Sequence, residues 1–132
     1  MIVLDSSAAV ELLLGLPRAA PLIRERLATP GEAVHVPHLF DLEVMASVRR
    51  HLLRGALSVE RASGALAALA ALRATRYPHA PFRARIWQLR ENLTPYDAAF
   101  VSLAEALEAP LVTLDAALAE APGVRAEVEL YP

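Results

Sequence analysis

Short apolar runs alternate with longer amphipathic segments along this chain. Four of the runs have the length and composition of buried strands: residues 2–4, 33–36, 111–114 and 128–131. A further short edge strand is expected around residues 76–78. Strands that are separated by helical segments predict an α/β fold with a parallel sheet covered by helices on both faces.

Helix boundaries between these strands carry recognisable signals. Pro37 opens a long amphipathic helix that Gly55 ends, and Ser58 caps the next helix. Thr94 places a hydroxyl cap before Pro95, which takes the first helical position. The helix after Pro95 is expected at residues 96–108, and the others at residues 8–14, 21–27, 81–90 and 116–119.

The composition is that of a globular protein. With 132 residues, of which 55% are hydrophobic and 21% charged, the chain is expected to form a single domain over residues 1–132. The absence of cysteine excludes disulfides, Cys-ligated zinc, iron–sulfur clusters and thiol catalysis. The sequence has neither a signal-peptide pattern nor an apolar run long enough to span a bilayer, so a cytoplasmic protein without a membrane partner is expected.

Charge is unevenly distributed, although the net charge is only −2. All thirteen basic residues are arginines, and nine of them lie between residues 47 and 90, where Glu60 is the single acid. A basic segment beside an acidic site is one way to hold a phosphate backbone near metal ions, and Arg49 and Arg50 are candidates for RNA or protein contact. The same pattern also fits a solvated helix face.

Four acids occupy positions that suit chemistry. Asp5 and Asp115 directly follow apolar strands, and ligands bind parallel sheets beyond the carboxyl ends of the strands. Glu43 lies close to the apolar side of the long helix, and Asp97 lies in the first turn of its helix. Taken singly, each has a structural explanation, since Asp caps helices and a negative charge is favourable at a helix N-terminus.

The interpretation changes if all four acids meet in one cleft. Two carboxylates ~4 Å apart repel by about 4 kcal/mol at an effective dielectric of ~20, so such a cluster persists only with protons or a divalent cation. Oxygen-only ligation suits Mg²⁺ or Mn²⁺, and phosphodiester hydrolysis fits the chemistry of such a site. The short hydroxyl side chains of Ser6 and Thr113 lie near the strand ends, where they can orient carboxylates.

These acids lie in four segments with a recognisable order: residues 2–13, 36–44, 93–104 and 110–115. The segments resemble the acidic motifs of PIN-domain ribonucleases, especially the VapC-type toxins of bacterial toxin–antitoxin pairs. The resemblance covers the whole chain. The third and fourth segments together are specific to the family, whereas the first alone would be a weak signal.

The resemblance implies a three-layer α/β/α sandwich around a mostly parallel five-stranded sheet. It implies an endoribonuclease that is the toxin of a pair, forms a homodimer and is covered at its site by a small cognate antitoxin. It further implies an Mg²⁺ or Mn²⁺ site formed by four acids and supported by two hydroxyls: Asp5, Glu43, Asp97 and Asp115, with Ser6 and Thr113.

Two other functions remain open from the sequence: a nuclease acting on DNA, and a non-catalytic PIN-like binding or regulatory module. Two others are excluded. A haloacid-dehalogenase-type phosphatase needs a second Asp where this chain has Ser7, and a two-component receiver domain needs a lysine. Trp87 is expected in the core, and Phe40 and Phe100 in the core or at a dimer contact. The histidines lack metal-ligand spacing: His35, His38, His51 and His79.

Overall fold

A computed structural model describes residues 1–131, and within them the chain forms five strands, seven α-helices and one 3-10 helix. The strands are β1 (Ile2–Leu4), β2 (Val34–Pro37), β3 (Ala74–Tyr77), β4 (Leu111–Thr113) and β5 (Val128–Leu130). The helices are α1 (Ser6–Leu14), α2 (Ala20–Leu27), α3 (Phe40–Leu53), α4 (Val59–Ala71), η1 (Ala80–Phe82), α5 (Arg83–Gln88), α6 (Pro95–Leu107) and α7 (Ala116–Glu120).

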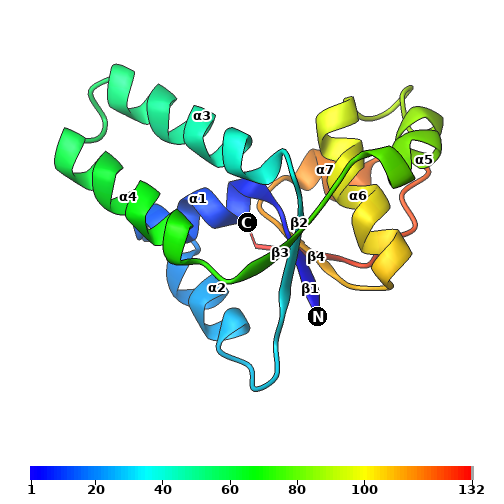
Figure 1. Ribbon diagram of the computed structural model, residues 1–132, viewed down its shortest axis with the longest axis horizontal. Helices are drawn as coiled ribbons and strands as arrows, with labels where there is room; N and C mark the ends of the chain where they lie inside the picture. The colour runs from blue at the N-terminus through cyan, green and yellow to red at the C-terminus, as the bar shows by residue number, and fades with distance from the viewer. Residues whose placement is uncertain (132) are drawn as a thin grey trace.

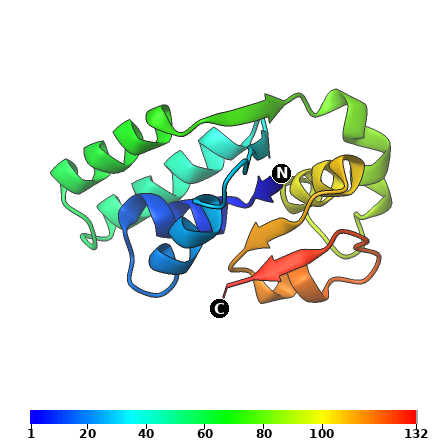
Figure 2. The ribbon, with the colours of Figure 1, turned by 90° about the horizontal axis from the view of Figure 1, so that it is seen from below.

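The five strands form one sheet in the order β3-β2-β1-β4-β5, and all neighbouring pairs are parallel. β3 and β5 lie at opposite edges of the sheet (Figure 2). Helices α1 to α4 lie on one side of the sheet and α5 to α7 on the other (Figure 1). The predicted three-layer α/β/α fold with a parallel five-stranded sheet is therefore confirmed. The strand order reverses between β1 and β4, and ligands bind at such a point in open parallel sheets.

The core lies around the two central strands and helix α6. Every residue of β1 and β4 is buried, as are seven consecutive residues of α6, Ala98–Ala104. Phe40 at the start of α3 and Phe100 in α6 are both fully buried, so the core alternative holds for each. Because α3 and α6 are anchored by these aromatic side chains, the acids in their first turns have fixed starting positions beside the sheet.

The long helix begins later than expected. Pro37 was predicted to open it, but Pro37 is the last residue of β2 and pairs with Tyr77 of the edge strand β3. The pairing continues with the backbone N–H of His38, which donates to the Tyr77 carbonyl at 2.8 Å. The helix therefore begins only at Phe40. The edge strand was expected, but its pairing with β2, which displaces the helix start, is a long-range contact that local signals do not report.

The prediction that Trp87 lies in the core is wrong. Trp87 is 65% exposed rather than in the core, and the guanidinium of Arg90 lies 5.0 Å from its ring centroid. On α3, Val44 is buried while Leu42 and Met45 are exposed, so the helix buries a narrower stripe than its apolar content indicates. α5 is a short helix with no buried residue, and it provides no interior position for an indole.

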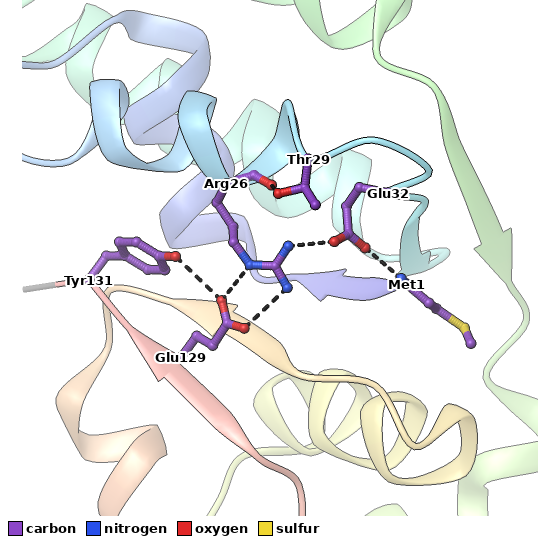
Figure 3. Close-up of polar contacts among 6 residues, drawn as sticks. All are labelled: Met1, Arg26, Thr29, Glu32, Glu129 and Tyr131. Atoms are coloured by element: carbon purple, nitrogen blue, oxygen red, sulfur yellow. Dashed lines mark hydrogen bonds and ion pairs between the residues drawn. The ribbon is translucent and has the colours of Figure 1, made fainter.

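A polar network joins the chain start to α2 and β5 (Figure 3). The amino group of Met1 pairs with Glu32, whose carboxylate also pairs with Arg26. Arg26 in turn donates to Glu129 of β5 at 2.9 Å, and the Tyr131 hydroxyl donates to the same carboxylate at 3.3 Å. The network secures the edge strand β5 against α2. Within residues 1–131, no helix combines the length and the apolar character needed to cross a membrane.

Candidate active site

A cleft of about 290 Å³ opens beyond the carboxyl ends of β1 and β4, where the strand order reverses. All four acids selected from the sequence line this cleft, and they come from four separate parts of the chain. The lining residues are Asp5, Ser6, Ser7, Val10, Glu43, Ala46, Ser47, Arg50, Asp97 and Asp115. The structure therefore brings together residues that lie up to 110 positions apart in the sequence.

Asp5 is the most constrained of the four acids. It follows β1 directly, is only 4% exposed, and caps α1 by accepting a hydrogen bond from the backbone N–H of Ser6 at 2.9 Å. Its other oxygen accepts from the hydroxyls of Ser7 at 2.7 Å and Thr113 at 2.6 Å. Asp5 therefore caps α1 with one carboxylate oxygen, binds two hydroxyls with the other, and also lines the cleft.

The two hydroxyls that donate to Asp5 also bind the backbone at the end of β4. Thr113 Oγ1 accepts from the backbone N–H of Asp115 at 3.0 Å, and Ser7 Oγ accepts from that of Leu114 at 3.0 Å. The two hydroxyls are 3.2 Å apart. They join Asp5, at the end of β1, to the backbone of Leu114 and Asp115, at the end of β4.

Ser7 was not selected from the sequence, where Ser6 was chosen together with Thr113. The Ser6 hydroxyl instead donates to Glu43 Oε1 at 3.3 Å. This bond is longer than those that Ser7 and Thr113 make with Asp5. The spacing of Ser7 from Asp5 could have identified this contact. A serine two positions after an aspartate can donate its hydroxyl to that carboxylate within a short turn.

The other three acids are positioned by helix N-termini. Glu43 lies in the first turn of α3. Asp97 lies in the first turn of α6, where its backbone N–H donates to the capping hydroxyl of Thr94 at 3.2 Å, as the Thr94-Pro95 signal predicts. Asp115 caps α7 by accepting from the backbone N–H of Ala117 at 2.9 Å. Each of these acids therefore lies at the N-terminus of its helix, α3, α6 or α7, where the helix dipole favours a negative charge.

Burial and mutual repulsion raise the pKa of three of these carboxyl groups. For Asp5, burial is the largest cause, and it outweighs the hydrogen bonds that the carboxylate accepts. Burial also leads in raising the pKa of Glu43, followed by the charges of Asp5 and Asp97. The pKa of Asp97 is raised by burial and then by the charges of Asp5 and Asp115. Full ionisation of this cleft is therefore unfavourable without a compensating cation.

These raised pKa values predict that the metal-free protein loses stability as the pH rises. Above about pH 4 the carboxyl groups of the unfolded chain are ionised, while Asp5, Glu43 and Asp97 still hold protons in the folded state. Their contribution is complete below about pH 4 and is lost as the pH rises through their folded-state pKa values. Glu32 and Glu105, whose pKa values are lowered, act oppositely, and their contribution is lost as the pH falls.

The measurement is the Tm in EDTA between about pH 4 and about pH 8, a range that brackets carboxyl ionisation. The parent protein should show a falling Tm, and the Asp5→Asn variant a shallower fall. A parent Tm that increases steadily across this range would contradict the raised pKa values.

The two adjacent arginines selected from the sequence have different surroundings. Arg50 lines the acidic cleft, whereas Arg49 lines an apolar groove between α3 and α4. The groove is bordered by exposed apolar side chains of both helices, among them Met45 and Leu66. Arg49 and Arg50 therefore line two neighbouring surfaces, which share Ala46.

Comparison with known proteins identifies the family. Residues 2–124 match the family model of the PIN domain. Over 130 residues the chain is 44% identical to Ribonuclease VapC12 of Mycobacterium tuberculosis, and the match covers 98% of each protein. Two solved structures share the fold over 100% of both chains. They are VapC20 of Mycobacterium tuberculosis, a sarcin-ricin loop cleaving toxin (TM-score 0.74, 14% identity), and VapBC2 of Rickettsia felis bound to a promoter DNA fragment (TM-score 0.65, 17% identity).

The two kinds of likeness carry different weight. The solved structures support the fold alone, because their sequence identities are low. The family model spans most of the chain, and the relative VapC12 is similar in sequence from end to end. The chain therefore belongs to the PIN-domain family and, within it, to the VapC ribonucleases.

Proposed function

We propose that this protein is a metal-dependent endoribonuclease that hydrolyses RNA phosphodiester bonds in the cleft between β1 and β4. One observation carries the proposal: the cleft gathers four carboxylates, three of which have raised pKa values. A protein has little structural use for this arrangement, since the repulsion costs stability. A divalent cation offsets the repulsion and turns the arrangement into a functional one. The ribonuclease names of the VapC relatives support RNA as the substrate.

The residues of the cleft fit a hard divalent cation. The donors are carboxylate and hydroxyl oxygens, the ligands that Mg²⁺ and Mn²⁺ prefer. Within residues 1–131, no group of three Asp, Glu or His side chains converges closely enough to hold an ion by itself. Mg²⁺ tolerates this, because it keeps several of its waters and uses only one or two direct carboxylates. We assign four acids as its ligands, some direct and the others through the waters that the ion keeps: Asp5, Glu43, Asp97 and Asp115.

The chain's own contribution to the reaction is to position these acids. A bound divalent cation would lower the pKa of a water and stabilise charge on a phosphoryl oxygen. Thr113 and Ser7 hold one oxygen of Asp5 in place through two hydrogen bonds, so this carboxylate needs little reorganisation. Ser6, the first residue of α1, donates a hydrogen bond to Glu43. The helix N-termini at the cleft favour an anionic substrate group.

We further propose that residues 1–132 act as one nuclease domain in the cytoplasm, as the toxin of a toxin–antitoxin pair. The chain's place among the VapC ribonucleases supports that role, and its fold is shared with VapC20, which is a toxin, and with the VapBC2 complex. The partners are then an RNA substrate, a second copy of the chain and a cognate antitoxin that covers the cleft. A short neighbouring reading frame that encodes a DNA-binding protein would be the expected source of the antitoxin.

Cleavage of matched substrates tests the proposed activity. Purified protein should cut single-stranded RNA in Mg²⁺ or Mn²⁺ and should be inactive in EDTA. The DNA oligonucleotide of identical sequence, which lacks the 2′-OH, should remain intact. Equal cleavage of both would make the protein a general nuclease. Binding of RNA without cleavage in either metal would favour the non-catalytic module.

A further inference from the structure

One face of α3 forms a continuous wall of the acidic cleft. Glu43, Ala46, Ser47 and Arg50 all line it, and their spacing of three, four and seven residues places them on one side of the helix. The wall therefore runs from a carboxylate at the start of the helix to a guanidinium two turns further along. Arg50 is the one cation among the residues that line the cleft.

The guanidinium of Arg50 is not committed to another group. The side-chain ion pairs within residues 1–131 involve Arg26, Arg76 and Arg85, each of which donates to one carboxylate through two nitrogens. Arg50 takes no part in these pairs. Its charge acts on Glu43 only through space, where it opposes the rise in the pKa of that acid. An exposed, unpaired guanidinium on the wall of an otherwise anionic cleft is suited to bind an anionic ligand.

The helix geometry sets where that ligand would lie. Seven residues at a rise of 1.5 Å separate the backbones of Glu43 and Arg50 by about 10 Å along the axis of α3. We propose that Arg50 binds a backbone phosphate of the RNA next to the scissile one, and so holds the strand in register across the four carboxylates. This proposal rests on the ribonuclease function. It makes Arg50 a positioning residue that acts through the substrate strand.

A cation at this position would help an acidic cleft to bind RNA, which is itself an anion. The cleft repels a polyanion wherever its acids are not neutralised, and a cation at the end of the wall provides local attraction to the strand. Arginine matches phosphate geometry with two parallel N–H donors, which adds orientation to attraction. Arg49 is the natural comparison, because it carries the same charge one position earlier but lies over the apolar groove between α3 and α4.

The test separates binding from cleavage. In an Asp5→Asn background with Mg²⁺, the affinity for a fluorescein-labelled single-stranded RNA is measured at several KCl concentrations. Arg50→Ala should weaken binding about tenfold, as expected for loss of one charged hydrogen-bonded contact. It should also reduce the slope of log affinity against log salt by about 0.7, the share of one phosphate on a single strand. Arg49→Ala should leave affinity and slope unchanged, and Arg50→Lys should restore the slope but only part of the affinity.

A neutral methylphosphonate at each position near the cut site then locates the contact. At one flanking position it should weaken binding about tenfold in the Asp5→Asn background and cause no further loss when Arg50→Ala is also present. Equal losses in Arg49→Ala and Arg50→Ala, or an unchanged salt slope, would overturn the proposal. So would unaltered RNA binding in an Arg50→Ala variant that no longer binds the antitoxin. If the parent protein binds RNA with this dependence on Arg50 but never cleaves it, the nuclease proposal fails, and Arg50 is left as a phosphate contact with no scissile bond beside it.

Discussion

Replacement of Asp5 by Asn is expected to reduce metal-dependent RNA cleavage by about 10³-fold, because several kcal/mol of transition-state stabilisation depend on the metal. The same change should raise the Tm of the metal-free protein. Asp5 is almost fully buried, and its pKa is raised by that burial, so its ionised form destabilises the folded state at neutral pH. The variant would therefore be more stable but inactive. This is expected where a residue that is needed for activity lowers the stability of the fold.

Asn can fit at this position without disturbing its neighbours. Its carbonyl oxygen can accept from the Ser6 N–H, and its amide can donate toward the hydroxyls of Ser7 and Thr113, which are free to rotate. Asp41→Asn is the matched control, because it removes the same charge from an acid that pairs with Arg76 outside the cleft. Rates are compared in single-turnover assays with Tm measured on the same samples. Cleavage by Asp5→Asn at the parent rate would refute the assignment of this residue.

Replacement of Ser7 by Ala is expected to lower cleavage about 10- to 100-fold, the usual cost of removing a group that orients a metal ligand. The Ser7 hydroxyl donates to Asp5 and accepts from the Leu114 N–H, so its loss releases one oxygen of the carboxylate and leaves a backbone donor without its acceptor. The free energy of unfolding should fall by about 1 kcal/mol from the lost hydrogen bond.

The matched control is the neighbouring hydroxyl. Ser6→Ala removes a longer hydrogen bond of 3.3 Å to the half-exposed Glu43, so its cleavage rate and its stability should both fall less than in Ser7→Ala. Steady-state cleavage and urea unfolding of the two variants decide the order. A larger loss in Ser6→Ala would show that Glu43, rather than Asp5, is the carboxylate whose orientation limits the reaction.

The fold follows from local patterns to a large extent, and two of the four acids follow with it. Buried apolar strands separated by helices predict the parallel sheet. That sheet places Asp5 and Asp115 next to each other, at the carboxyl ends of β1 and β4. Glu43 and Asp97 could not be placed beside them from periodicity alone. Their directions depend on how α3 and α6 pack against the sheet, which Phe40 and Phe100 decide in the core. The family resemblance provided this step.

What the sequence could not predict depends on contacts between distant segments. Helix α3 begins later than predicted because Pro37 pairs with Tyr77, a residue forty positions away. Ser7 acquired its role through Thr113 and Leu114 on the neighbouring strand. Trp87 is exposed because α5 has no buried position for it, although tryptophan is usually well buried on average. In each case, residue type gave a preference and tertiary contacts overrode it.

The proposed function requires that four carboxylates from distant segments jointly hold a divalent cation. An anomalous difference map from crystals grown with millimolar Mn²⁺ shows whether they do. A peak is expected in the cleft, within ligand or water-bridged distance of Asp5, Glu43, Asp97 and Asp115. In Asp5→Asn crystals the peak should be weak or missing. Parent crystals without a Mn²⁺ peak in this cleft, or with Mn²⁺ only at other acids, would show that these carboxylates do not hold the metal.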